Sequence, residues 1–396
     1  MTEGGGTMTS PELDVDAVLR DPAIRIVVCC GSGGVGKTTT SAALALRAAE
    51  HGRRVVVLTI DPARRLAQAL GLAHLDNHPR MVAGATGSDK DGNGGELHAM
   101  QLDMKRTFDE VVLAHTTEEK ARQIFANPFY QSLSSSFAGT QEYMAMEKLG
   151  QLRARGDWDL VVVDTPPSRS ALDFLDAPQR LGNFLDGRMI RLLAAPAKAG
   201  GRASLRVVSV GFSLFARAVT RIIGTQVITD IAAFVASLET MFGGFRERAQ
   251  ITYDLLRRPG TAFLVVSTPE PDALREASYF VERLSAEEMP LAGLVLNRVH
   301  VSAVPQLSAQ RAEAAAEQLE EGGVHPLTAA VLRLHADRMA LAARETRLRQ
   351  RFSSAHPDVA VAQIPAMASD VHDLAGLRQI GTALARPTGT GQRAHA

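Results

Sequence analysis

The sequence predicts an α/β fold in which a mostly parallel sheet is flanked by helices, with a helical subdomain inserted into it. Short apolar runs rich in β-branched residues recur along the 396-residue chain, and helical patterns separate them. Strands that are buried on both faces and alternate with helices favour a parallel sheet. The runs cover residues 24–30, 54–60, 160–164, 262–268, 291–297 and 359–365.

Two long segments interrupt this alternation. Residues 104–156 and 180–257 carry helical patterns and no strand pattern. Between Phe212 and Phe245 apolar residues recur at spacings of three and four, which predicts wide apolar helix faces. These faces are either the core of a helical subdomain or a groove for an apolar client. The adaptable contacts of such a groove would be Met144, Met146, Met189 and Met241.

Apart from these inserted helices, we expect one domain over residues 21–385. Residues 1–20 and 386–396 are predicted to be flexible tails. The polar stretch "GATGSDKDGNGGE", residues 84–96, is rich in glycine and predicts a mobile loop.

The stretch "GSGGVGKTTT", residues 31–40, carries the clearest chemical signal. Gly31, Gly36, Lys37 and Thr38 meet the spacing G-x-x-x-x-G-K-[ST], between a strand pattern and an alanine-rich helix pattern. In such a loop main-chain N–H groups bind phosphate oxygens, the lysine contacts the β- and γ-phosphates, and the hydroxyl ligates Mg²⁺. The sequence therefore predicts a P-loop NTPase. The residues expected to cradle the nucleotide are Gly31, Ser32, Gly33, Gly34, Val35, Gly36, Lys37 and Thr38.

Two aspartates follow apolar strands. Asp164 ends the run "LVVVD", where folds of this kind place the carboxylate that holds Mg²⁺, and we expect it to act through water. Asp61 ends the run 54–60 just before Pro62, and it is either a helix N-cap or a carboxylate that orients the attacking water. We predict Asp61, Lys37 and Asp164 as catalytic residues, and Thr38, Asp61 and Asp164 as metal ligands.

A third strand end carries an amide, because Asn297 closes the run 291–297. An amide can donate to and accept from the edge of an adenine ring. Asn297 is therefore a candidate for a contact with the base.

The bulk properties restrict the class of protein. The formal net charge is zero, with 43 basic and 43 acidic residues, so no nucleic acid partner is expected. Cys29 and Cys30 are the two cysteines, and as strand neighbours they face opposite ways, so neither a disulfide nor a zinc site is expected. The chain shows neither a signal peptide pattern nor an apolar run of about 18 residues. We expect a cytoplasmic protein, with peripheral attachment at the inner membrane as the alternative.

With these residues in order, the chain resembles the ArsA-type ATPases over about residues 24–380. This family includes the arsenite-pump ATPase and the guided-entry ATPase that delivers tail-anchored membrane proteins. The resemblance is carried by "GSGGVGKTTT", "TIDPARRL", "VVVDTPPSRSALDFLDAP", "STPEPDALREA" with "VLNRV", and "IPAMASDVHDL". Within the family, the chain looks most like one member of the paired actinobacterial ArsA-like ATPases.

The resemblance implies roles for matching positions. Asp61 is similar to the first switch aspartate, which positions water, and Asp164 to the second, on the Mg²⁺ side. Thr39 looks like the contact to the α-phosphate. The implied adenine pocket consists of Asn297, Arg298, Pro365, Ala366 and Met367. The implied assembly is a dimer with ATP at its interface, whose cycle opens and closes an apolar helical surface.

The chain also departs from the family. The metal-linking Cys-x-x-Cys pair and the spaced cysteines of an arsenite site are absent, and only one ATPase half is present. Ser32 stands where relatives carry a lysine that reaches the partner's nucleotide. Three interpretations stay open: a paralogous subunit supplies the lysine; an arginine such as Arg64, Arg65 or Arg169 substitutes; or the chain is a slow, ATP-set switch. We favour the heterodimer, and the substitution by an arginine is the runner-up; a homodimer is the alternative assembly.

The hypothesis for function is an ATP-hydrolysing dimeric switch that acts on an apolar client protein or a membrane partner. The alternative is a catalytic subunit that energises a membrane anion transporter. A third class, a positioning switch that binds DNA or membrane, is less favoured because of the helical segments and the motifs above.

Overall fold

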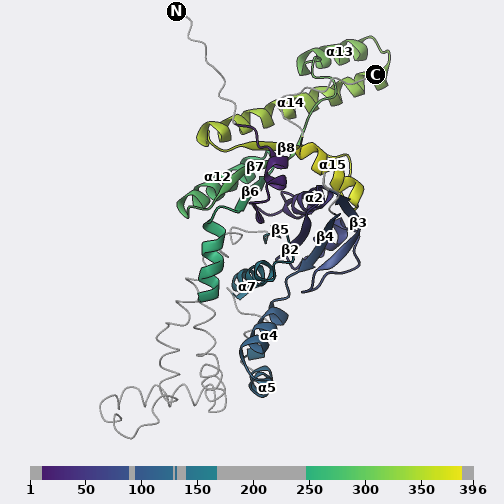
Figure 1. Cartoon of the computed structure of the whole chain (residues 1–396). Coiled ribbons are helices and arrows are strands. Elements are labelled where there is room, and N and C mark those ends of the chain that lie inside the picture. The colour runs from purple at the N-terminus through teal and green to yellow at the C-terminus, as the bar shows by residue number, and fades with distance from the viewer. Residues whose placement is uncertain (1–10, 89–93, 128–129, 132–139, 167–246, 386–396) are drawn as a thin grey trace, which may run out of the picture. The chain divides into compact units, whose positions relative to one another are not determined.

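The structure is a computed structural model that describes residues 11–88, 94–127, 130–131, 140–166 and 247–385 (Figure 1). The chain divides into two compact units, which we describe separately. The first comprises Met1–Gln101, Asp157–Ala171 and Leu256–Ala396, and the second Leu102–Gly156 and Leu172–Leu255.

An eight-stranded sheet forms the centre of the first unit, as the sequence predicts. Its strand order is β3-β4-β2-β5-β1-β6-β7-β8, and all neighbours are parallel except β3 and β4. The strands are β1 (Ile26–Cys30), β2 (Arg54–Thr59), β3 (Arg80–Ser88), β4 (Gly94–Gln101), β5 (Leu160–Asp164), β6 (Thr261–Ser267), β7 (Leu291–Val299) and β8 (Val361–Pro365). Every residue of the central strands β1, β5 and β6 is buried, which explains their continuous apolar runs.

The prediction of a loop over residues 84–96 is wrong at both ends of that stretch. Gly84–Ser88 belongs to β3 and Gly94–Glu96 to β4, and the two strands pair in antiparallel fashion. Glycine is required here by close packing, because a Cβ on Gly95 would lie 1.9 Å from the carbonyl oxygen of Ala49. Composition therefore suggested a loop where the glycines in fact allow two strands to pass close to a helix.

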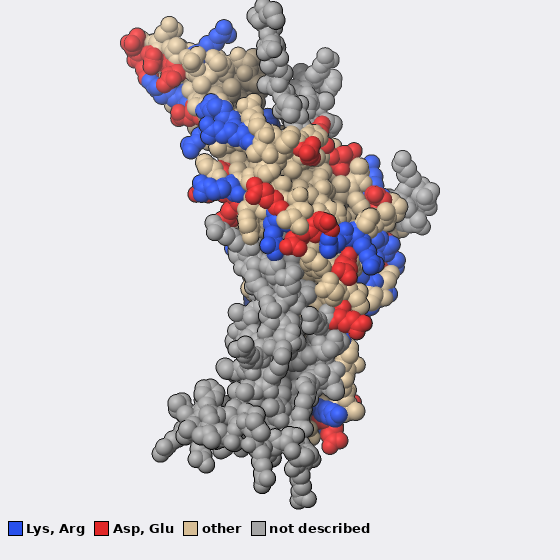
Figure 2. All heavy atoms as spheres, turned by 90° about the vertical axis from the view of Figure 1, so that its left-hand side faces the viewer, with Lys and Arg blue, Asp and Glu red and all other residues tan. Residues whose placement is uncertain are grey.

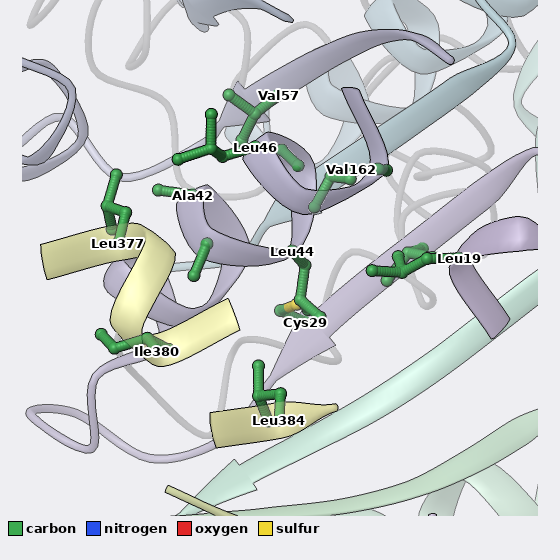
Figure 3. Packing of buried hydrophobic residues seen from close by; sticks show 14 of the residues in the cluster. Leu19, Cys29, Ala42, Leu44, Leu46, Val57, Val162, Leu377, Ile380 and Leu384 are labelled. Atoms are coloured by element: carbon green, nitrogen blue, oxygen red, sulfur yellow. The ribbon is translucent and has the colours of Figure 1, made fainter. Parts of the chain in front are cut away.

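The helix α2 (Lys37–Glu50) lies in the main hydrophobic core of this unit (Figure 3). Its side chains Leu44 and Leu46 are fully buried, and Cys29 of β1 and Val57 of β2 belong to the same cluster. The helix α15 (Leu374–Leu384) covers α2 with Leu377, Ile380 and Leu384. The helix α2, which begins directly after the phosphate loop, thus packs between the sheet and α15.

The predicted N-terminal tail, residues 1–20, is contradicted by the structure over residues 11–20. There α1 (Val15–Arg20) is capped by Asp14, whose side chain accepts a hydrogen bond from the N–H of Ala17 at 2.9 Å. Val15 and Leu19 are buried in the main core. Glu12 also forms a bridge to Val361 of β8. Residues 1–10 and 386–396 lie outside the described residues.

The remaining described helices of the first unit are α3 (Arg65–Ala69), α12 (Pro271–Ala286), α13 (Ala309–Glu321) and α14 (Pro326–Ala355). The helix α12 packs on β6 and β7 and buries Phe280 and Leu284. The helices α13 and α14 lie side by side (Figure 1) and are joined by an ion pair between Glu320 and Arg333 at 2.6 Å.

The second unit is helical where it is described. It contains α4 (Met104–His115), α5 (Glu118–Ala126), α7 (Thr140–Arg155) and most of a helix over residues 247–257. Glu147 of α7 accepts hydrogen bonds from Arg248 at 3.2 and 2.9 Å, which joins the segments on either side of residues 167–246.

Met144 and Met146 were expected to serve as adaptable contacts, but both side chains are fully buried. Met189 and Met241, like all of residues 180–246, lie outside the described residues. For the two methionines that can be assessed, the structure therefore favours the interpretation as core.

Basic and acidic side chains are interspersed over the described part of the face shown in Figure 2. Among the described helices, none combines the length and the apolar character needed to cross a membrane.

Candidate functional site

The phosphate loop follows β1, and two of its glycines are required by close contacts. Gly31 has φ +148°, and a Cβ there would lie 2.1 Å from the carbonyl oxygen of Val266 in β6. Gly36 has φ +94°, and its Cβ would lie 2.3 Å from Nδ2 of Asn297. A side chain at position 31 would meet the backbone of β6, and one at position 36 would displace the Asn297 amide.

At Gly34 the situation is different. Its φ of +80° favours glycine, yet nothing lies within 4 Å of a Cβ placed there. The loop is therefore open at this position, as expected if a ligand approaches the backbone.

Lys37 begins α2 and is 5% exposed. Its ammonium group donates to the carbonyl oxygens of Gly31 at 3.0 Å and Ser32 at 2.8 Å, so the side chain folds back over its own loop. Burial lowers the pKa of Lys37, and the nearby carboxylates of Asp164 and Asp61 oppose that shift. An anion bound in the loop would compensate the same buried charge.

Asp164, at the end of β5, is fully buried beside the loop. Its Oδ2 accepts hydrogen bonds from the hydroxyls of Thr38 and Thr59, each at 2.8 Å. Its Oδ1 is buried and has no hydrogen-bond partner among the described residues. Burial raises the pKa of Asp164 to about 6, against the hydrogen bonds from the two threonines.

These groups fit a magnesium–nucleotide ligand. A buried carboxylate oxygen that lacks a partner is costly, and a hard cation with its water shell would satisfy it. The Thr38 hydroxyl donates to the same carboxylate, so two of the three predicted oxygen ligands lie together, and a contact of Asp61 with the metal stays a prediction.

Thr59 was missed by sequence reasoning. It ends β2, and its register partner in β5 is Asp164. The signal was present in the sequence, since a polar residue closes an otherwise apolar strand, but only the sheet order shows that β2 and β5 are neighbours.

Asp61, two residues beyond Thr59, is 7% exposed. Its Oδ1 accepts from the N–H of Ala63 at 2.9 Å, and its Oδ2 lies 3.9 Å from the guanidinium of Arg65. Its charge acts on both Lys37 and Asp164. The N-cap of α3 is Arg64, so the interpretation of Asp61 as a helix N-cap is wrong; Asp61 instead closes a local turn with Ala63. The water-orienting role stays a prediction.

The residues predicted to form the adenine pocket meet at one end of β7 and β8. Val299 pairs with Pro365, and the N–H of Ala366 donates to Val299 at 2.9 Å. Met367 is 36% exposed. Asn297 bonds instead to the phosphate loop, donating to the carbonyl of Val35 at 2.8 Å. Contact of these residues with a base stays a prediction.

The other loop residues lie at the start of α2 or before it. Thr39 is half-buried, Gly33 is exposed and Ser32 is 9% exposed. Arg169, one of the arginines considered as a substitute cation, lies outside the described residues.

Comparison with known proteins gives a consistent result. Residues 24–321 match the anion-transporting ATPase family. The chain is 26% identical over 298 residues to ATPase ARSA2 of Chlamydomonas reinhardtii, which covers 73% of this chain and 72% of that protein. It is 29% identical over 168 residues to ATPase GET3 of Malassezia globosa, covering 42% of this chain and 46% of that protein.

A third relative is Protein Rv2184c of Mycobacterium tuberculosis, 31% identical over 166 residues, or 41% of this chain and 39% of that protein. The matches to the Malassezia and Mycobacterium proteins thus span less than half of either partner. The family match is longer, and it contains the phosphate loop, Asp61 and Asp164. The chain therefore belongs to the anion-transporting ATPase family and is an ATPase.

Proposed function

We propose that the chain is a dimeric switch that couples binding and hydrolysis of Mg²⁺-ATP to the opening and closing of an apolar helical surface for a client. One observation carries the nucleotide part of this proposal. Asp164 joins Thr38 of the phosphate loop to Thr59 of β2 through one oxygen, while its other oxygen is buried beside the loop without a partner among the described residues.

In this proposal each side chain has a distinct role. Lys37 would exchange its two loop carbonyls for phosphate oxygens, and Thr38 and Asp164 would hold Mg²⁺. Bound there, Mg²⁺ would neutralise charge on the phosphate oxygens. Asp61 orients the water that attacks the γ-phosphorus and accepts its proton, the bond to the β–γ bridging oxygen breaks, and ADP and phosphate leave.

In this proposal the switch responds to the loss of the γ-phosphate charge, and the response passes through residues at the ends of β2 and β5. Thr59 contacts Asp164, and the Asp61 N–H donates to Thr59 Oγ1 at 3.2 Å. A change at the γ-phosphate therefore has a direct route to the segment between β2 and α3. Gln101, the last residue of β4, donates to the Asp61 carbonyl at 3.2 Å and extends that route across the sheet.

For the dimer, we propose that a paralogous ATPase subunit supplies the cation that Ser32 lacks. Ser32 is short, and its carbonyl already accepts from Lys37. The competing source is Arg65 of the same chain, which is 60% exposed at its side chain, lies 3.9 Å from Asp61 and acts electrostatically on Lys37.

Hydrolysis assays on the chain alone, and mixed with its candidate paralogue, distinguish these sources. A cation supplied in trans contributes a factor of about 10³ or more in related phosphoryl transfers, so the mixture should be far faster than either chain. Ser32→Lys should raise the rate of the isolated chain, and Arg65→Ala should leave the mixture nearly unchanged. Full activity of the isolated chain that disappears in Arg65→Ala would instead assign the cation to this chain.

The client part of the proposal rests on the helical patterns of residues 104–156 and 180–257 and on the family resemblance. Purification from native cells in the presence of ATP or ADP tests it. We expect an apolar client to accompany the chain in one nucleotide state, and no state-dependent partner would contradict this.

The alternative is a subunit that energises a membrane anion transporter, which the description of the matched family favours. Recovery of a multi-span carrier, together with ATPase stimulation by its transported anion, would support this alternative.

A further inference from the structure

An irregularity in β7 lies directly beside the phosphate loop. The register between β7 and β8 shifts between Leu296 and Val299, and Arg298 adopts the left-handed conformation with φ +60°. Such conformations cost free energy in residues other than glycine. Irregular strands often redirect one side chain at a functional site, and here that side chain is Asn297.

Both ends of the Asn297 amide are engaged. Its Nδ2 donates to the carbonyl of Val35 at 2.8 Å, and its Oδ1 accepts from the N–H of Arg298 at 2.9 Å. The hydrogen bond to its own bulge fixes the orientation of the amide, so the donor group faces the loop. Gly36 leaves the space for this contact, since a Cβ there would lie 2.3 Å from Nδ2.

The segment after Asn297 is held from its other side by α14. The N–H of His300 donates to Oε2 of Glu345 at 2.8 Å, and the His300 ring nitrogen Nδ1 lies 2.6 Å from Oε1. Glu345 is 6% exposed. The bulge is therefore fixed between a buried carboxylate and the phosphate loop.

From these contacts we infer that Asn297 is a positioning residue for the phosphate loop, in addition to any contact that the same end of β7 makes with a base. Val35 and Gly36 directly precede Lys37, so the amide holds the backbone on which the ammonium depends. Its contribution to nucleotide affinity should consequently be independent of the base.

Titration calorimetry with Mg²⁺-ATP and with Mg²⁺-tripolyphosphate, which has no base, tests this inference. Asn297→Leu removes the amide with little change in size. Loss of one hydrogen bond should weaken both ligands by a similar factor, about five- to tenfold. Asn297→Ser, whose side chain is too short to reach Val35, should give the same pattern if Asn297→Leu does not fold. The matched control is Gln363→Leu, which removes an amide from β8 beside Leu296 and should change neither affinity.

The number of ligands bound per chain distinguishes a displaced phosphate loop from a folding defect. A partly unfolded variant binds fewer ligands per chain with unchanged Kd, whereas a displaced loop raises Kd at full stoichiometry. Weakened ATP binding with unchanged tripolyphosphate binding would overturn the inference and assign Asn297 to the base alone. Unchanged affinity for both ligands would also overturn it.

Discussion

At the scale of single residues, the carboxylate of Asp61 has both a structural role in a turn and a proposed role in hydrolysis. The two roles can be separated by substitution. Oδ1 closes the turn through Ala63 N–H, and the charge of Asp61 acts on Lys37 and Asp164. Asparagine can close the same two-residue side-chain turn as aspartate. Asp61→Asn should therefore preserve the fold and ATP binding while lowering the hydrolysis rate by about 10²-fold or more, since an amide is a poor base.

Steady-state kinetics and thermal unfolding of the same preparation check this prediction. Asp61→Ala serves as the comparison, because it removes the turn hydrogen bond and the charge together and should lower both stability and rate. An Asp61→Asn variant with the wild-type rate would show that Asp61 acts only in the turn.

Asp164 gives a prediction about pH. Burial raises its folded-state pKa to about 6 from an ordinary value of 3.8, so the folded protein holds this proton more tightly than the unfolded chain. The contribution of Asp164 to stability is therefore lost as the pH rises from about 3.8 to about 6, and it stays lost above that range. The nucleotide-free variant Asp164→Asn should gain stability relative to wild type over this interval.

Differential scanning calorimetry at about pH 5 and about pH 7 measures that gain, since groups common to both proteins cancel in the comparison. The Tm difference between variant and wild type should be larger at the higher pH. A difference that does not vary with pH would mean that Asp164 is already ionised in the acidic sample.

At the scale of elements, the N-terminal helix α1 shows what composition alone conceals. Its six residues follow a glycine-rich stretch and suggested a tail, yet Leu19 is fully buried. Leu19→Ala should lower the free energy of unfolding by about 2–5 kcal/mol. The control is Leu327→Ala, because Leu327 lies in α14 and is 78% exposed. This change should lower the free energy of unfolding by less than about 0.5 kcal/mol.

Denaturant unfolding of the two variants compares these costs directly. Equal effects would show that α1 does not belong to the core in solution.

The elements that the sequence predicts best are those whose local signals agree with their final surroundings. The apolar run before the loop, the glycines and the alanine-rich helix gave β1, the loop and α2, with strand ends displaced by at most two residues. The sequence does not predict strands whose composition is set by packing against residues far away in the chain. The pair β3–β4 contains glycines because it passes against Glu50 and Ala49, which no local pattern reveals.

At the scale of the whole sheet, strand order decides which residues form the site. Lys37 and Asp164 could be predicted because each ends or follows a recognisable strand. Thr59 could not be assigned a role, because that required β5 to lie between β2 and β1. The engagement of Asn297 with Val35 likewise depends on where β7 lies relative to the loop.

In our proposal the cation that Ser32 lacks comes from a partner subunit, which no local sequence pattern of this chain can show. Arg65 is near enough to act on Lys37 within one chain, whereas a partner's lysine would act only in a complex. The mixing experiment with the paralogue tests which of the two sources supplies the cation.

The central claim is that Asp164, with Thr38, forms the magnesium side of the nucleotide site, and the Mg²⁺ dependence of ATP affinity tests it most directly. Calorimetric titration of ATP with and without Mg²⁺ should show at least about tenfold tighter binding with the ion in the wild type, and little enhancement in Asp164→Asn. Asp159→Asn, just before the opposite end of β5, is the matched control and should keep the wild-type enhancement. Equal enhancement by Mg²⁺ in all three proteins would contradict the account.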